Sequence, residues 1–225
     1  MSNTGGMAKL GISALMFGLV VSAGCHPSSK ALRPGAGPIV QQDREVAAFD
    51  SVSLRGTYEA QVEVGAEQRV TLEGELDRIA EIETTVEDGE LRVRFPKGIS
   101  FRNDGGIRLV IVSPHLTAIE TDGATQLDVT GLRGASFDLE VNGSTQAHLD
   151  GEITALNAEV NGAGDLDSTD LLAQSVAIEV NGTGQADVTA LASLDAEING
   201  AGRVRYRGEP KVAKAVHGVG RVRPF

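Results

Sequence analysis

Apolar and polar residues alternate along most of the chain from Val46 onward. Segments such as AQVEV, RVTLEG, LRVRF, IRLVIV and FDLEV place an apolar residue at every second position, and Gly, Asn and Asp separate them. A period of two is typical of β-strands that bury one face. Only ELDRIAEIE, from Glu75 to Glu83, has helical spacing, so the pattern predicts an all-β fold in which helix is minor.

A two-residue turn recurs at nearly constant spacing in the second half of the chain, within EVNGSTQ, EVNGAGD, EVNGTGQ and EINGAGR. With Asp122 and His217 in the place of Asn, successive turns are 20, 19, 20, 18 and 18 residues apart. So steady a period indicates stacked repeats. It predicts a single-stranded parallel β-helix, or β-solenoid, with coils of about 18–20 residues. The repeated turn residues are Asn142, Gly143, Asn161, Gly162, Asn181, Gly182, Asn199 and Gly200.

An antiparallel sandwich or barrel is the alternative, because Asn-Gly between two isolated strands is a hairpin signal. Asn and Gly both tolerate positive φ, so we expect the pair to let the chain turn a sharp corner. In a solenoid, residues at the same place in neighbouring coils form inward columns. One column is expected to contain Thr121, Val141, Val160, Val180, Ile198 and Val216. The segment RGTYEAQV, which starts at Arg55, also fits the repeat, with Ala60 and Val62 in inward places.

Two polar rows are expected on the outside of the coils. One contains Glu120, Glu140, Glu159, Glu179 and Glu197, and the other contains Asp128, His148, Asp167, Asp187, Arg205 and Arg223. Carboxylates stacked about 4.8 Å apart repel each other. We interpret the glutamate row as an exposed ladder that water and salt screen. The alternative is a row of divalent-cation sites, because Ca²⁺ prefers carboxylate oxygens. Otherwise the sequence predicts no cofactor and no metal, since it has no Cys/His cluster and no phosphate-binding loop.

The segment EINGAGRVRYRGEP, from Glu197 to Pro210, resembles the signature of the head GIN domain family. This bacterial family is described as putative auto-transporter adhesins, and the resemblance covers roughly Val46 to Arg223. It implies an exported β-helix-like domain, often carried on a lipoprotein.

The N-terminus has the pattern of a bacterial lipoprotein signal. Lys9 precedes the apolar stretch LGISALMFGLVV, and SAGC ends at Cys25, the only cysteine of the chain. We predict a signal peptide at residues 1–24, lipid attachment at Cys25 and a flexible Pro-, Gly- and Ser-rich tether at 25–45. The head GIN-like β-solenoid domain is expected at 46–225. An ordinary cleavage site beside an unrelated cysteine is the alternative. His26 after the cysteine resembles the sorting pattern for the outer membrane, so we expect an outer-membrane lipoprotein of the cell envelope, on its periplasmic or surface face.

Composition and charge narrow the range of functions that the chain can have. The chain of 225 residues has a formal net charge of −11, which disfavours nucleic acid as a partner, and its aromatic content is only 4%. We expect a non-catalytic binding, adhesion or scaffolding module, bound to the membrane through its lipid and to an envelope protein or glycan, and oligomers are compatible with this. One alternative is a polysaccharide-active enzyme that uses Asp167 and Asp187 at the spacing of a retaining glycosidase. Another is a purely structural envelope protein.

The charges are unevenly distributed. Residues 120–202 include fifteen acidic side chains and one basic one, Arg133, whereas residues 203–225 include seven basic side chains and one acidic one, Glu209. The basic end could meet an anionic surface, an acidic partner or the acidic flank of another copy. Alternatively, its Lys and Arg residues protect the last strand from edge-to-edge aggregation.

Overall fold

The computed structural model describes residues 31–32, 37–96, 100–101 and 106–225, and nearly all of them are in strands. The predicted signal peptide and Cys25 lie outside the described residues. The short helix α1 spans Leu76–Ile79, and no helix of the described ranges is long and apolar enough to cross a bilayer. The strands are β1 (Ala31–Leu32), β2 (Ile39–Asp43), β3 (Ser51–Val64), β4 (Arg69–Glu75), β5 (Glu83–Glu87), β6 (Glu90–Arg94), β7 (Ser100–Phe101), β8 (Arg108–Ser113), β9 (Ala118–Gly143), β10 (Gln146–Gly162), β11 (Asp165–Gly182), β12 (Gln185–Gly200), β13 (Arg203–Arg207), β14 (Lys211–Gly218) and β15 (Arg221–Pro224).

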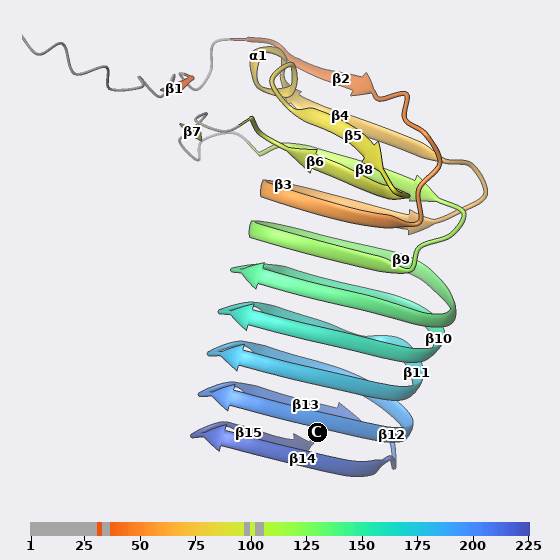
Figure 1. The fold of residues 1–225 in the computed structure, drawn as a ribbon, viewed down its shortest axis with the longest axis vertical. Coiled ribbons are helices and arrows are strands. Elements are labelled where there is room, and N and C mark those ends of the chain that lie inside the picture. Colours follow the sequence, from red (N-terminus) through yellow and green to blue (C-terminus); the bar gives the residue numbers. More distant parts are fainter. Residues whose placement is uncertain (1–30, 33–36, 97–99, 102–105) are drawn as a thin grey trace, which may run out of the picture.

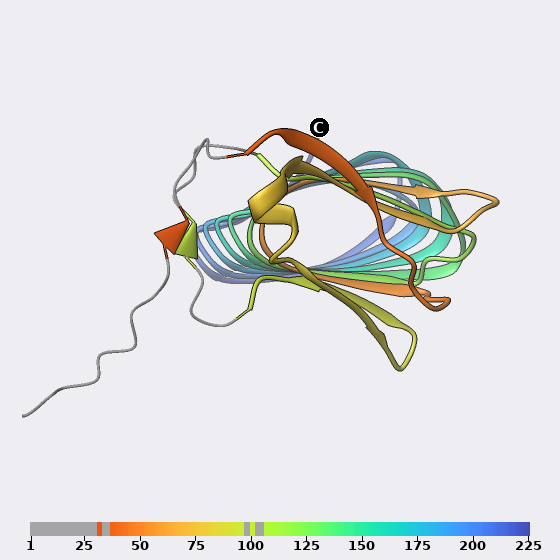
Figure 2. The same cartoon turned by 90° about the horizontal axis from the view of Figure 1, so that it is seen from above.

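The second half of the chain is a parallel β-solenoid, as the repeat predicts. Strand β9 wraps through more than one coil and β10 to β12 each wrap through most of one, and each coil pairs in parallel with the coils before and after it (Figure 1). Glu159, for example, is the Cα partner of both Glu140 and Glu179. Seen from above, the coils superpose as closed loops (Figure 2). The antiparallel alternative is wrong for this part of the chain.

The inward columns form one continuous hydrophobic core. Val160, Val180 and Ile198 stack in register and are fully buried, because each coil covers the inward side chains of its neighbours. The solenoid also begins before the obvious repeats, as predicted. Strand β3 pairs in parallel with β9 and places Ala60 beside Leu127 and Val62 beside Val129.

Glycine, and not asparagine, makes the corner of each coil. Gly143, Gly162, Gly182 and Gly200 have φ between +120° and +140°, a conformation that other residues rarely adopt. Asp88 is the only residue other than glycine with positive φ in the described part of the chain. Within each pair the glycine therefore makes the turn without positive φ at Asn, and the Asn side chains have a different role, described below.

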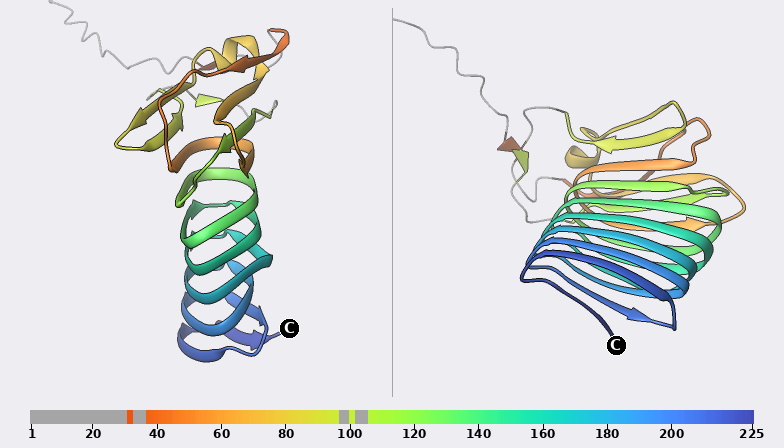
Figure 3. Two further views of the ribbon diagram at one scale, coloured as in Figure 1. Left: turned by 90° about the vertical axis from the view of Figure 1, so that its right-hand side faces the viewer. Right: turned by 60° about the horizontal axis from the view of Figure 1, so that its bottom comes forward.

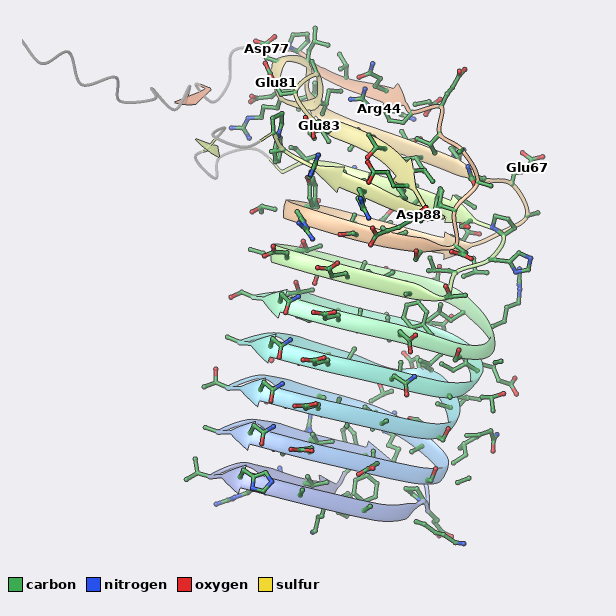
Figure 4. The ribbon with its side chains drawn as sticks, in the orientation of Figure 1. Arg44, Glu67, Asp77, Glu81, Glu83 and Asp88 are labelled. Atoms are coloured by element: carbon green, nitrogen blue, oxygen red, sulfur yellow. The ribbon has the colours of Figure 1, made fainter. Side chains whose placement is uncertain are left out.

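A small antiparallel unit covers the N-terminal end of the solenoid (Figures 1 and 3). Strands β2 and β4 and strands β4 and β8 pair antiparallel, and β8 then pairs in parallel with β3. The β5–β6 hairpin joins the same edge of β3 through β6, which pairs with Ser51–Arg55, whereas β8 pairs with Glu59–Val64. Strand β2 belongs to the stretch expected as tether, so part of that stretch is in the sheet. Figure 4 shows Arg44, Asp77, Glu81 and Glu83 on this N-terminal cap.

Candidate binding faces

One outer face of the solenoid, which we call the Glu face, presents the predicted glutamate row. Glu140, Glu159, Glu179 and Glu197 stand in consecutive register, and Glu120 is the Cα partner of Ser53 one coil earlier. Side chains of one kind repeat from coil to coil on this face (Figure 4). A shallow groove of about 490 Å³ runs along it.

The four turn asparagines form a hydrogen-bonded ladder beside the glutamates. The Nδ2 atoms of Asn161, Asn181 and Asn199 each donate to Oδ1 of the asparagine one coil earlier, at 3.0, 2.9 and 2.9 Å. Identical amides can continue such a ladder from coil to coil because each offers both a donor and an acceptor. The ladder joins neighbouring coils at the corner of the loop.

The asparagine ladder also relieves the repulsion within the glutamate row. Nδ2 of Asn142 donates to Oε1 of Glu140 at 2.8 Å, and Nδ2 of Asn161 donates to Oε1 of Glu159 at 2.9 Å. Asn199 lies within 3.2 Å of the Oε1 atoms of both Glu179 and Glu197. Screening by solvent is therefore not the only relief, because an asparagine Nδ2 atom lies within hydrogen-bond distance of each of these carboxylates.

The ends of the glutamate row meet cationic or titratable groups. Oε1 of Glu120 lies 3.7 Å from Nη2 of Arg55, and Oε1 of Glu197 lies 4.0 Å from Nε2 of His217. Within the described residues, no three His, Cys, Asp or Glu side chains are grouped where they could hold a metal ion. The glutamates stand in a line with one per coil, so the geometry gives the cation-site alternative no support.

The opposite outer face, which we call the Gln/Asp face, has a larger groove of about 710 Å³. One row along it contains Glu59, Gln126, Gln146, Asp165 and Gln185, and the next contains Gln61, Asp128, His148, Asp167 and Asp187. Arg108 closes the N-terminal end of the groove, where its guanidinium lies 3.8 Å from Glu59 and 3.3 Å from Glu73. The groove thus presents amide and carboxylate groups at regular intervals.

The structure brings Asp167 and Asp187 together as neighbours in register. Asp187 is engaged by Arg205, whose Nε donates to Oδ1 at 2.7 Å while its Nη2 contacts Oδ2. Partial burial raises the pKa of Asp167, but hydrogen bonds from Thr169 outweigh it and, with the nearby charges of His148 and Arg207, lower the pKa below its ordinary value. A glycosidase needs one carboxylic acid with a raised pKa as its general acid. The lowered pKa of Asp167 is the opposite of that feature, and Asp187 is paired with Arg205.

We expect NMR titration of the Asp167 carboxyl to give a pKa below the ordinary value of about 3.9. The hydroxyl and backbone N–H of Thr169 hold the charged form at 2.7 and 3.0 Å, so Thr169→Ala should raise the pKa by removing one of the two bonds. Because the folded-state pKa is below the unfolded one, this group stabilises the fold above about pH 3.9, and the contribution is lost as the pH falls further. A pKa above the ordinary value would make Asp167 a candidate general acid and revive the enzyme alternative.

His148 does not bridge Asp128 and Asp167, its two neighbours in the row. Its Nε2 lies 3.9 Å from Oδ2 of Asp170, which belongs to the next coil but not to the Asp128–Asp167 row. The ring is partly exposed and lines the groove. The arrangement makes His148 a polar member of the groove surface.

The fold and the two faces define the chain as a capped parallel β-solenoid that displays regular rows of hydrogen-bonding side chains. The chain belongs to the head GIN domain family, described as putative auto-transporter adhesins, whose model matches residues 48–210. This finding confirms the resemblance expected from EINGAGRVRYRGEP.

Solved structures share the fold. A putative adhesin from Bacteroides fragilis is 21% identical, with a TM-score of 0.67 over 84% of this chain and 97% of that one. A putative lipid binding protein from Parabacteroides distasonis is 16% identical, with a TM-score of 0.54 over 87% of this chain and 100% of that one. Among curated proteins, none matches the chain.

Proposed function

We propose that the protein is a non-catalytic binding module of the cell envelope, which serves adhesion or scaffolding. Its ligand is an elongated glycan or protein segment that lies along the Gln/Asp face. The adhesin description of the family supports a role in binding.

The observation that carries this proposal is the continuous groove with repeated polar rows. Successive coils offer the same kinds of group about 4.8 Å apart, so a ligand with a repeating backbone can make the same hydrogen bonds several times. Gln126, Gln146 and Asp165 occupy equivalent places in three successive coils. Polar side chains with several donors and acceptors suit hydroxyl-rich or peptide ligands.

The predicted lipid on Cys25 would hold the module at the outer membrane, and the stretch after Cys25 would link the lipid to the solenoid. The lipidated N-terminus and the tether are part of the proposal, since they lie largely outside the described residues.

The proposal is tested by the retention of envelope polysaccharides and intact cell envelopes on the purified full chain. We expect Gln126→Ala with Gln146→Ala to weaken retention about fivefold to 150-fold, because two adjacent hydrogen-bonding places in the groove are lost and each is worth roughly 0.5–1.5 kcal/mol. The matched control is Gln41→Ala with Gln42→Ala on strand β2, where both side chains are exposed and outside the groove.

Equal losses in both double variants would contradict binding in the groove. Turnover of a polysaccharide that depends on Asp167 or Asp187 would replace the proposal with the enzyme alternative. Failure of the wild-type chain to retain any glycan or envelope fraction would favour the structural alternative.

A further inference from the structure

Five arginines form an array on the outward face of the last two strands of the Gln/Asp face. Arg203, Arg205 and Arg207 come from β13, and Arg221 and Arg223 come from β15. Arg203 is the Cα partner of Arg221, and Arg205 is the partner of Arg223. Neighbouring strands are about 4.8 Å apart, so this arginine array places like charges directly opposite each other, which is destabilising.

Protection of a sheet edge explains only part of the arginine array. Strand β15 is the last strand of the sheet, and basic residues there discourage pairing with another chain. Strand β13 is not an edge, because it pairs with β12 on one side and β15 on the other. Edge protection therefore does not account for the three arginines of β13, of which Arg205 pairs with Asp187 within the solenoid.

Part of the arginine array is left without a protein partner. Arg205 binds Asp187, and Nη1 of Arg203 lies 3.3 Å from Oε1 of Gln185. The guanidinium carbons of Arg205 and Arg207 lie 4.5 and 4.7 Å from the centre of the Phe225 ring. In the part of the chain that the structure describes, Arg221 and Arg223 are exposed and make no ion pair. Their guanidinium groups are available to external anions.

Apolar side chains are exposed next to these charges. Val219, in the turn between β14 and β15, is 80% exposed and Phe225 is 53% exposed. Val212 and Val216 of β14 extend the columns of buried Leu194 and Ile198 but are more than a third exposed. Basic and apolar side chains thus occur together at the C-terminal end of the solenoid (blue in Figures 1 and 3).

We infer that this end is a docking site for an anionic lipid surface. Guanidinium groups bind lipid phosphates through paired hydrogen bonds, and the valines and Phe225 enter the boundary between headgroups and acyl chains. The rest of the solenoid is acidic and is repelled by the same surface, so contact is confined to the C-terminal end. The solenoid then meets the membrane end-on and leaves both outer faces accessible.

A second copy of the chain fits this end less well. Two C-terminal ends would bring arginine array against arginine array. The acidic flank of another copy offers carboxylates, but those of the Glu face already accept hydrogen bonds from the asparagine ladder, and its polar surface would leave Val219 and Val216 unpartnered. A lipid surface satisfies both the charged and the apolar groups.

The test uses the full chain in which Cys25→Ser removes the natural cysteine and Val219→Cys or Ala66→Cys carries an environment-sensitive fluorophore. Ala66 is exposed beside Glu67 on the cap (Figure 4). Vesicles of phosphatidylcholine alone are compared with vesicles that also contain phosphatidylglycerol. Both labelled proteins carry the same N-terminal apolar segment, so membrane contact made by that segment is the same for the two labels. A difference between the labels therefore reports contact at the labelled position. We expect the label at position 219 to enter an apolar environment only with anionic vesicles, and the label at position 66 to stay unchanged.

Arg221→Gln with Arg223→Gln should lower the docking constant about 30-fold, because each basic residue at an anionic surface contributes roughly fivefold. Arg69→Gln with Arg133→Gln is the matched control. It removes two exposed arginines elsewhere, and docking should remain as in the unsubstituted chain. Raised salt should also weaken docking.

An equal response to neutral and anionic vesicles, or equal docking by the two arginine double variants, would overturn the inference. Suppression by millimolar inorganic phosphate would also overturn it, because the site would then bind single ions. Binding of heparin without any response to anionic vesicles would assign the arginine array to a polysaccharide. Self-association without vesicles, lost in Arg221→Gln with Arg223→Gln, would assign it to a second copy. The groove residues Gln126 and Gln146 are not in the array, so this test and that of the proposed function can fail independently.

Discussion

Gly182→Ala is expected to destabilise the solenoid by about 4 kcal/mol or more, a loss that is exceptional for one methyl group. Gly182 has a φ of +137°, and a Cβ added there would lie 2.4 Å from the carbonyl oxygen of Gly162 in the previous coil. Backbone strain and a clash with the neighbouring backbone therefore act together. Equilibrium unfolding in guanidinium chloride measures the loss.

Gly134→Ala separates the two causes. Gly134 has nearly the same φ, +140°, but a Cβ there would meet no atom within 4 Å. This control substitution should lower the free energy of unfolding only by the conformational strain, about 1–3 kcal/mol. Equal losses at the two positions would show that the approach of neighbouring coils at the corner is not what requires glycine.

The stacking register could be predicted from the sequence because a solenoid turns spacing along the chain into contact. Glu159 lies between Glu140 and Glu179 since the turns recur every 18–20 residues, and a slip by one residue would turn Val160 outward. The buried column that includes Val160 and the alignment of β3 with β9 follow from the same periodicity.

The N-terminal cap could not be predicted in the same way, because it lies outside the repeat. Strand β2 is short, follows a Pro- and Gly-rich stretch and finds its antiparallel partner in β4, beyond β3 in the sequence. No local pattern encodes that pairing. Two separate strands, β6 and β8, continue the sheet beyond β3. This pairing also depends on tertiary contacts and not on a local sequence pattern.

The chemistry of the outer faces was only partly predictable. Rows of like residues follow from periodicity, but the direction of a hydrogen bond depends on side-chain rotamers in two coils at once. Asn is common at turns because it tolerates turn backbone conformations, so its recurrence was explained without its side chain. The ladder that the side chains form was therefore not expected. One signal for the ladder was available in the sequence. Asn recurs two places after Glu in successive repeats, and side-chain amides one coil apart can form hydrogen bonds with each other.

Asn161→Asp is expected to destabilise the fold by about 2–3 kcal/mol at pH 7, although it changes the side-chain shape very little. Asn161 donates to Oδ1 of Asn142 and to Oε1 of Glu159, and a carboxylate can do neither. It also adds a negative charge beside Glu159, which raises the folded-state pKa of the new carboxyl above the unfolded value of about 3.9. The loss should thus be small near pH 4, where the protonated acid can donate, and grow as the pH rises through the folded-state pKa. Chemical unfolding of variant and wild type at matched pH measures it.

Two further variants separate the charge from the missing hydrogen bonds. Asn161→Ser removes the amide without adding charge, so its loss should change less between pH 4 and pH 7 than that of Asn161→Asp. Glu159→Gln combined with Asn161→Asp restores a donor next to the new carboxylate and should recover part of the stability at pH 7. A loss of stability in Asn161→Asp that is independent of pH and unaffected by Glu159→Gln would mean that the asparagine ladder does not relieve the repulsion within the glutamate row. The row would then depend on solvent screening alone, and its spacing would be set only by the backbone.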